Sequence, residues 1–276
     1  MNVDFLELLR IIFLSIVQGI TEWLPVSSTG HMILVEEFLT FSHSEAFWRV
    51  FLVVVQLASV LAVITTFFKQ LNPFTFKKGW KTDGDIIHLW FKIAFASIPA
   101  GIVGILFDDL IEAHLETPVV IAAALIFYGI IFIIVEHVNK NKSDRITTLP
   151  QITYKLAFMI GIFQMLALVP GTSRSGATII GGLLLGMSRK TAAEFTFFLA
   201  IPAMVGGSLI RILQVGFHFT TAEWITLIVG CLTAFIVSVI TIKFLLGFIK
   251  HNSFKPFAYY RIVLGLLVLI YFSFIF

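Results

Sequence analysis

The chain has 276 residues, of which 58% are hydrophobic and only 13% are Asp, Glu, Lys or Arg, and its net charge is +3. Soluble domains are about half apolar and a quarter charged, so this composition excludes a soluble domain as well as a disordered chain. The long continuous apolar runs favour membrane helices over the alternating strands of an outer-membrane barrel. At roughly 20 residues for each span, about six to eight membrane segments fit into the chain.

Eight apolar segments follow one another along the chain. The first, about 5–38, and the fifth, about 156–187, are each interrupted in the middle by Pro, Gly and small hydroxyl residues. The other six are continuous and long enough to cross a bilayer as helices. These six predicted spans are about 47–68, 86–107, 117–135, 191–212, 222–246 and 259–276.

The two interruptions are Pro25-Val-Ser-Ser-Thr-Gly30 and Pro170-Gly-Thr-Ser-Arg-Ser-Gly176. Proline has no backbone donor and clashes with the preceding helical turn, so we expect a helix to end at each of them. Non-helical backbone at membrane depth is tolerated only where protein covers it or where it lines a water-filled cavity. Each interrupted segment is therefore predicted to be a re-entrant helix–loop–helix hairpin, which enters the membrane and returns.

The charges of the loops predict the topology. Loops 69–85, 136–155 and 247–258 are rich in Lys and Arg, whereas loop 107–116 carries acids. Because Lys and Arg mark the cytoplasmic side, six spans and two hairpins place all three basic loops there and both termini outside. The first hairpin then enters from outside and the second from the cytoplasm. The basic residues are thus topology signals, and no nucleic-acid partner is expected.

This arrangement is typical of an inverted repeat within a single membrane domain that covers residues 1–276. The predicted halves, 1–136 and 151–276, are joined by the basic cytoplasmic loop 137–150. Gln18 precedes the first interruption much as Gln164 precedes the second, and the interruptions resemble each other. Inverted repeats with broken helices form their sites near the midplane, so we expect the two interruptions to meet there.

The first interruption carries an acid and a histidine. Gln18 and Glu22 are four residues apart and so share one helix face. An acid deep in an apolar segment is costly and usually faces a cavity or a partner, so Glu22 is interpreted as functional, with a structural hydrogen bond as the alternative. His31 follows the turn and could serve in acid–base chemistry. The hydroxyl residues between them are Ser27, Ser28 and Thr29.

The second interruption carries a cation. Arg174 lies among small residues between two apolar runs, where a permanent positive charge needs an anion. That anion is either a bound ligand or, in the simpler interpretation, Glu22 alone. The helix that restarts here also directs its N-terminal amides at the same space, which favours phosphate. The neighbours that we expect to contact substrate are Gly171, Thr172, Ser173, Ser175 and Thr178.

Together these groups suit a phosphate ester or anhydride carried by a lipid, with a divalent cation on the carboxylate as a further option. At the motifs Gln18-Gly-Ile-Thr-Glu22-Trp-Leu-Pro25-Val-Ser-Ser-Thr-Gly-His31 and Pro170-Gly-Thr-Ser-Arg-Ser-Gly-Ala-Thr178, the chain resembles the bacterial undecaprenyl-diphosphate phosphatases of the bacitracin-resistance type. The likeness extends over the whole chain in length and hydropathy.

The resemblance implies hydrolysis of undecaprenyl diphosphate to undecaprenyl phosphate and inorganic phosphate in the bacterial cytoplasmic membrane. This reaction recycles the lipid carrier for peptidoglycan synthesis and confers bacitracin resistance. The resemblance also implies a divalent cation, Mg²⁺ or Ca²⁺, held by Glu22 with Gln18. The family signature has Glu or Gln four residues before the Glu, and this chain has the Gln form. We further expect an active site open to the outer face, and a homodimer is a possible assembly.

Several alternatives remain open at the level of sequence. Ser27 attacks phosphorus after activation by Glu22 or His31, or else His31 attacks or activates water while Ser27 only holds phosphate oxygens; we favour Ser27. A second class of lipid phosphatase has a Ser-Arg motif with a His six residues later, but Ile180 occupies that position here. A transporter or flippase of a phosphorylated polyprenyl lipid is the alternative function, because broken helices in inverted repeats are typical of transporters.

Overall fold

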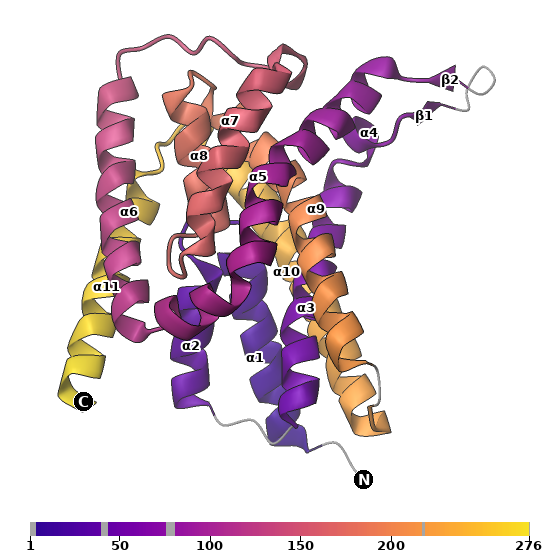
Figure 1. Cartoon of the computed structure of the whole chain (residues 1–276), viewed down its shortest axis with the longest axis vertical. Helices are drawn as coiled ribbons and strands as arrows, with labels where there is room; N and C mark the ends of the chain where they lie inside the picture. Colours follow the sequence, from indigo (N-terminus) through magenta and orange to yellow (C-terminus); the bar gives the residue numbers. More distant parts are fainter. Residues whose placement is uncertain (1–3, 40–43, 76–80, 217–218, 276) are drawn as a thin grey trace.

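The computed structural model describes residues 4–39, 44–75, 81–216 and 219–275, and these are almost entirely helical (Figure 1). A two-stranded pairing is the only sheet in the described ranges. The elements are α1 (Phe5–Thr21), α2 (Ser28–Phe38), α3 (Glu45–Thr66), α4 (Phe68–Leu71), β1 (Phe74–Thr75), β2 (Lys81–Thr82), α5 (Gly84–Leu115), α6 (Pro118–Asn139), η1 (Leu149–Gln151), α7 (Tyr154–Met165), η2 (Leu166–Leu168), α8 (Arg174–Leu184), α9 (Arg189–Val215), α10 (Thr221–Phe248) and α11 (Lys255–Ile275).

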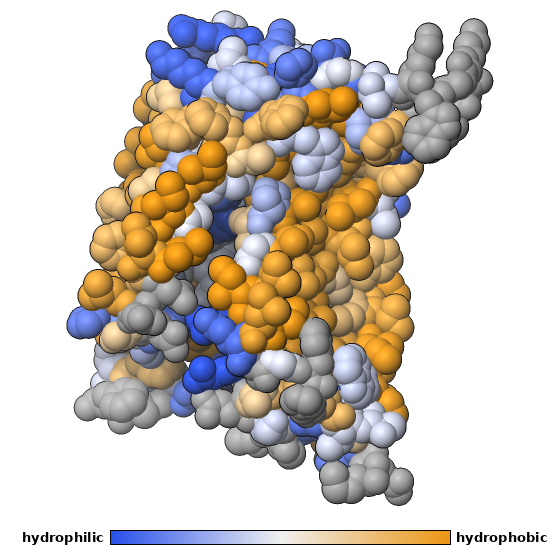
Figure 2. All heavy atoms as spheres, turned by 45° about the vertical axis from the view of Figure 1, so that its right-hand side comes forward, coloured by the Kyte–Doolittle hydropathy of each residue, from blue (hydrophilic) through white to orange (hydrophobic). Residues whose placement is uncertain are grey.

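Six of these helices are long and apolar enough to cross a membrane, and each overlaps one of the six continuous segments predicted from the sequence. The prediction of an all-α polytopic membrane protein with six spans is therefore confirmed. Figure 2 shows the expected surface, with a broad hydrophobic band across the visible face and hydrophilic residues gathered at one end. The spans are Ala46–Thr66, Gly84–Phe107, Pro118–Asn139, Arg189–Gln214, Thr221–Phe248 and Lys255–Phe274.

The sequence sets where the helices begin. Nine helices follow a Ser, Thr or Asp whose side-chain oxygen accepts a hydrogen bond from a backbone N–H two or three residues later. Such N-caps satisfy a donor that the first helical turn leaves without a partner, and each contributes about 1 kcal/mol. The capping residues are Asp4, Ser27, Ser44, Asp83, Thr117, Thr153, Ser173, Ser188 and Thr220.

The two interrupted segments fold as helix–loop–helix hairpins. The first consists of α1 and α2, and the second consists of α7, η2 and α8. In Figure 1 the open ends of the first hairpin lie at the bottom of the molecule and those of the second lie at the top, so their loops approach each other in the middle. Their depth in a bilayer, and hence their re-entrant character, stays a prediction.

Helices of the two predicted halves pack against each other in a reciprocal pattern. Helix α1 packs on α10 and α7 packs on α5, while α3 pairs with α9 and α6 with α11. The α5–α7 contact is very close, because a Cβ added at Gly161 would lie 2.1 Å from the Ala96 carbonyl oxygen. Each hairpin is thus fixed by a spanning helix from the other half of the chain.

Candidate active site

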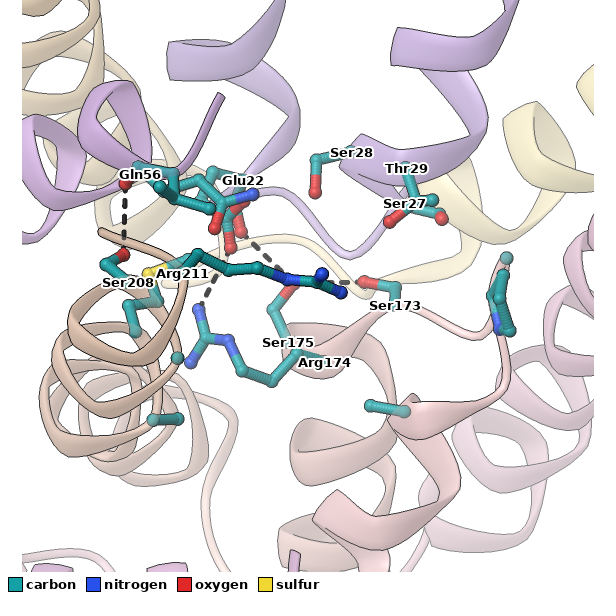
Figure 3. A pocket seen from close by; sticks show the side chains of 17 residues that line it. Glu22, Ser27, Ser28, Thr29, Gln56, Ser173, Arg174, Ser175, Ser208 and Arg211 are labelled. Atoms are coloured by element: carbon teal, nitrogen blue, oxygen red, sulfur yellow. Dashed lines mark hydrogen bonds and ion pairs between the residues drawn. The ribbon is translucent and has the colours of Figure 1, made fainter. Parts of the chain in front are cut away.

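A cavity of about 330 Å³ lies where the two hairpin loops meet (Figure 3). Four elements form its wall: the loops of the two hairpins and the spanning helices α3 and α9. Eight residues that the sequence singled out line it, namely Glu22, Ser27, Ser28, Thr29, Gly171, Ser173, Arg174 and Ser175. The expected meeting of the two interruptions is therefore observed.

Ser27 and Ser173 occupy equivalent places in the two loops. Each precedes the returning helix of its hairpin, and each has positive φ, 73° for Ser27 and 71° for Ser173. Their hydroxyl oxygens accept hydrogen bonds from the N–H groups of Gly30 (3.4 Å) and Gly176 (3.1 Å). The sharp turn places both short side chains at the cavity.

Glu22 is the carboxylate of the cavity and is only 6% exposed. Its Oε2 accepts a hydrogen bond from Nε2 of Gln18 at 2.9 Å, as the i, i+4 spacing predicts. Its Oε1 forms an ion pair with Nη2 of Arg174 at 3.3 Å, which links the first hairpin to the second. Both carboxylate oxygens therefore have N–H partners, and the ion pair considered from the sequence is present.

Arg174 is held on several sides. Its Nη1 donates to the carbonyl oxygen of Thr196 at 3.2 Å, and its guanidinium lies 5.9 Å from the ring centroid of Trp23. The neighbouring Ser175 donates its hydroxyl to the carbonyl oxygen of Leu24 at 3.2 Å. These contacts join the two loops and keep the cation at the cavity wall.

Arg261, on α11, was not expected at the site from the sequence, yet it is a central contact between the two loops. The side chain is 0% exposed. It donates to the carbonyl oxygens of Pro25 (3.2 Å), Gly171 (2.9 Å) and Thr172 (2.8 Å). A cation inside an apolar span was the signal in the sequence that could have identified it.

His31 does not line the cavity. Its Nδ1 lies 2.7 Å from the carbonyl oxygen of Ser27 and its Nε2 lies 2.6 Å from the hydroxyl of Tyr260, whose ring stacks on the imidazole. A carbonyl only accepts, so Nδ1 carries the proton and Nε2 accepts from Tyr260. Burial lowers the pKa of His31, and the charge of Arg261 lowers it further, against the hydrogen bond to Ser27. These contacts orient the ring toward the Ser27 backbone.

Three other expected residues also lie outside the cavity lining. Gln18 supports Glu22, as described above, and Thr172 is fully buried. Thr178 donates to the Arg174 carbonyl oxygen at 2.9 Å and accepts from the Thr196 hydroxyl at 2.9 Å, so it supports α8.

Gly171 lines the cavity and has a backbone conformation that favours glycine. Its φ is +89°, and a Cβ there would lie 2.5 Å from the Ile121 carbonyl oxygen. Packing against α6 therefore requires a glycine there, and its contact with substrate stays a prediction.

Helices α3 and α9 contribute polar residues that the sequence analysis did not assign to the site. Gln56 comes from α3, and Ser208 and Arg211 come from α9. All three are polar residues within apolar spanning helices, and this was the available signal.

The donor set of the cavity limits how a metal ion could bind. Among the described residues, no group of three or more His, Cys, Asp or Glu side chains could hold a metal. Glu22 is the one carboxylate in the cavity lining, and Gln18 can offer an amide oxygen beside it. Mg²⁺ commonly binds through one or two carboxylates plus substrate phosphates. The residues therefore fit a cation shared with a phosphorylated substrate, and not a closed protein site.

Comparisons with known proteins cover almost the whole chain. A family model described as Bacitracin resistance protein BacA matches residues 11–267. The chain is 57% identical to a protein named Undecaprenyl-diphosphatase from Enterococcus faecalis, over 98% of this chain and 99% of that one. Proteins of the same name from Desulfitobacterium hafniense (56%, covering 97% and 96%) and Lachnoclostridium phytofermentans (58%, covering 98% and 98%) are also similar. The chain therefore belongs to the bacitracin resistance protein BacA family.

Proposed function

We propose that this chain hydrolyses undecaprenyl diphosphate to undecaprenyl phosphate and inorganic phosphate. The observation that carries the proposal is the identity of more than half of its residues, over almost its full length, to proteins named Undecaprenyl-diphosphatase. The cavity supports it, because a carboxylate, an arginine and several hydroxyls are the groups that phosphoryl transfer needs. The activity recycles the lipid carrier for cell-wall synthesis and confers bacitracin resistance.

In the proposed reaction, the Ser27 hydroxyl attacks the terminal phosphorus and the bond from that phosphorus to the bridging oxygen breaks. The hydroxyl proton passes to Glu22, and the prenyl monophosphate leaves. Water then attacks the phosphoserine, and the bond from phosphorus to the Ser27 oxygen breaks. Glu22 returns its proton to that oxygen, and inorganic phosphate departs with both protons of the water. Arg174 stabilises the negative charge on the transferred phosphoryl group. Ser28, Thr29 and Ser173 supply hydroxyl donors to phosphate oxygens.

The position of His31 supports this scheme over direct attack by the imidazole. Both ring nitrogens have partners, and the residue lies outside the cavity lining. In the proposed mechanism His31 is a positioning residue, which holds the Ser27 backbone in its turn. Loss of turnover in Ser27→Ala, together with a labelled phosphoserine trapped in the wild type, is expected. Substantial turnover in Ser27→Ala with none in His31→Ala would instead place the histidine at the centre of the reaction.

We also propose that Mg²⁺ or Ca²⁺ assists the reaction, with Glu22 and Gln18 as its protein ligands and the diphosphate as the remainder of its coordination. When bound, the ion would neutralise phosphate charge. Each oxygen of the Glu22 carboxylate has one N–H partner and keeps a further lone pair for a cation.

The membrane placement belongs to the same proposal. Strands β1 and β2 and the loop from α6 to α7 lie at one end of the molecule, and the first hairpin opens at the other (Figure 1). With the basic end in the cytoplasm of a bacterial cell, the cavity opens to the outer face of the inner membrane. The reciprocal helix packing supports the proposal that the chain consists of two inverted halves.

A homodimer is part of the same proposal. Gly101 and Gly247 are exposed, and a Cβ added at either would meet no atom within 4 Å, which leaves room for a homodimer contact.

The decisive experiment incubates detergent-purified protein with prenyl diphosphate and measures free phosphate, with and without a chelator. Release of one phosphate per lipid, with prenyl monophosphate as the second product, is expected. A flippase would move the lipid across a vesicle membrane and leave its phosphates intact. Intact diphosphate after prolonged incubation in both detergent and vesicles would contradict hydrolysis.

A further inference from the structure

One wall of the cavity has no role in the reaction described so far. It is formed by α3 and α9 and contains Gln56, Ser208 and Arg211. Gly207, Ser208 and Arg211 lie on the same face of α9, because residues three and four apart are neighbours on a helix. Ser208 donates to the Val53 carbonyl oxygen at 3.1 Å, so this face of α9 is fixed against α3. The wall is therefore a rigid support for a long polar side chain.

The two arginines of the cavity enter it from opposite ends. The Arg174 guanidinium is bonded to Thr196, an early residue of α9, whereas Arg211 lies close to the end of the same helix. Fifteen residues of helix between these positions correspond to about 22 Å. Helical side chains lean toward the N-terminus, and Figure 3 shows Arg211 extending across the cavity toward Ser173. Two long side chains thus approach a common space from both directions.

The charges of the cavity lining indicate that Arg211 suits an anionic substrate. The charged residues of the lining are Glu22, Arg174 and Arg211. Glu22 carries one negative charge and the two arginines carry one positive charge each, so the lining has a net charge of +1. A diphosphate is a polyanion, and a guanidinium binds phosphate through two parallel N–H donors.

We propose that Arg211 is a second diphosphate-binding residue, which holds the phosphate that remains on the prenyl chain. This inference rests on the proposed function. Ser27, Glu22 and Arg174 surround the phosphoryl group that is transferred, and Arg211 contacts the adjoining phosphate from the other end of the cavity. Its charge attracts the substrate and stabilises the leaving prenyl monophosphate, whose bridging oxygen gains negative charge as the bond breaks.

The test measures steady-state kinetics of Arg211→Gln and Arg211→Lys in detergent with a water-soluble short-chain prenyl diphosphate, and product inhibition by prenyl monophosphate and by inorganic phosphate. For Arg211→Gln we expect at least about a tenfold loss in kcat/KM, because a neutral amide cannot replace a charge-assisted hydrogen bond to phosphate. Inhibition by prenyl monophosphate should weaken by a similar factor, while inhibition by inorganic phosphate stays unchanged. Arg211→Lys should recover part of the loss.

The matched control is Arg49→Gln, which removes the same charge from an exposed position outside the cavity lining and should behave as the wild type. Gel filtration checks that each variant is folded. Normal kinetics in Arg211→Gln would overturn the inference, as would weaker inhibition by inorganic phosphate alone. If the wild type itself released no phosphate, the proposed function would fail instead, so the two failures are distinguishable.

Discussion

Ser27 and Ser173 hold their backbones in the same left-handed conformation, with φ of 73° and 71°, and each caps the helix that follows it. This region costs a residue other than glycine about 1–2 kcal/mol, so the surrounding contacts must hold both turns in place. The two loops therefore share one local design: a strained serine that ends the loop, begins a helix and points its hydroxyl at the cavity.

The strain at Ser173 can be separated from its capping role by a pair of substitutions. Ser173→Ala keeps the strained backbone and loses the cap, so we expect a loss of about 1 kcal/mol in stability. Ser173→Gly loses the same cap but relieves the strain, and should be at least as stable as the wild type. Thermal unfolding in detergent measures both. Equal destabilisation of the two variants would show that the positive φ stores no strain.

Replacing Gln18 tests the proposed cation site. Gln18→Glu brings a second carboxylate to within hydrogen-bonding distance of Glu22, because the amide now lies 2.9 Å from it. The two like charges repel each other unless a proton or a cation lies between them. We expect the variant to keep its activity and to need a lower concentration of Mg²⁺ or Ca²⁺ for half-maximal turnover. An unchanged metal titration would argue against a cation at these two side chains.

Turnover should be sensitive even to the replacement of Arg261 by lysine. Its guanidinium donates to carbonyl oxygens of both loops, and a single ammonium cannot reproduce that planar fork. We expect Arg261→Lys to reduce turnover at least about tenfold, since an unsatisfied buried carbonyl costs roughly 1–3 kcal/mol and the loops would shift. Arg189→Lys is the control, because Arg189 pairs with Glu136 away from the loops. Similar activity in both variants would show that turnover does not depend on the contacts of Arg261 with the two loops.

The lowered pKa of His31 predicts a pH dependence of stability. The unfolded chain binds a proton near the ordinary value of 6.5, whereas the folded protein binds it only at lower pH. Stability should therefore fall as pH drops through 6.5 and continue to fall down to the lowered pKa. The melting temperature between pH 8 and 5 should decline more steeply for the wild type than for His31→Gln. The charged and titratable groups at the ring are Arg261 and Tyr260, and parallel curves would contradict the expectation.

Much of the fold was predictable because its signals are local. Apolar runs give the six spans, and proline with small residues gives the two hairpin loops. Glu22 and Arg174 were also recognisable, since an ionised group in an apolar segment needs a partner. An ion pair between Glu22 and Arg174 could be expected because each residue lies in one of the two interrupted segments, which were predicted to meet.

The remaining parts of the site depend on tertiary contacts that no local pattern carries. Arg211 and Arg261 are each a single cation in an apolar span, and the sequence does not tell which neighbours they reach. His31 lies near Glu22 along the chain, but its ring turns to Tyr260 on the last helix. The direction of a side chain follows from packing between distant helices, and the acid–base role expected of His31 could not reveal that both ring nitrogens already have partners.

The reciprocal packing of the hairpins has a consequence for biogenesis. The first hairpin leaves the ribosome earliest, yet α10, the spanning helix that supports α1, is among the last to be made. Until α10 is inserted, α1 has only α2 and α3 to pack on and lacks its most extensive contact, and Glu22 has no Arg174 until the second hairpin arrives. A nascent or truncated chain therefore holds no assembled site, and the enzyme gains its activity only when the final helices enter the membrane.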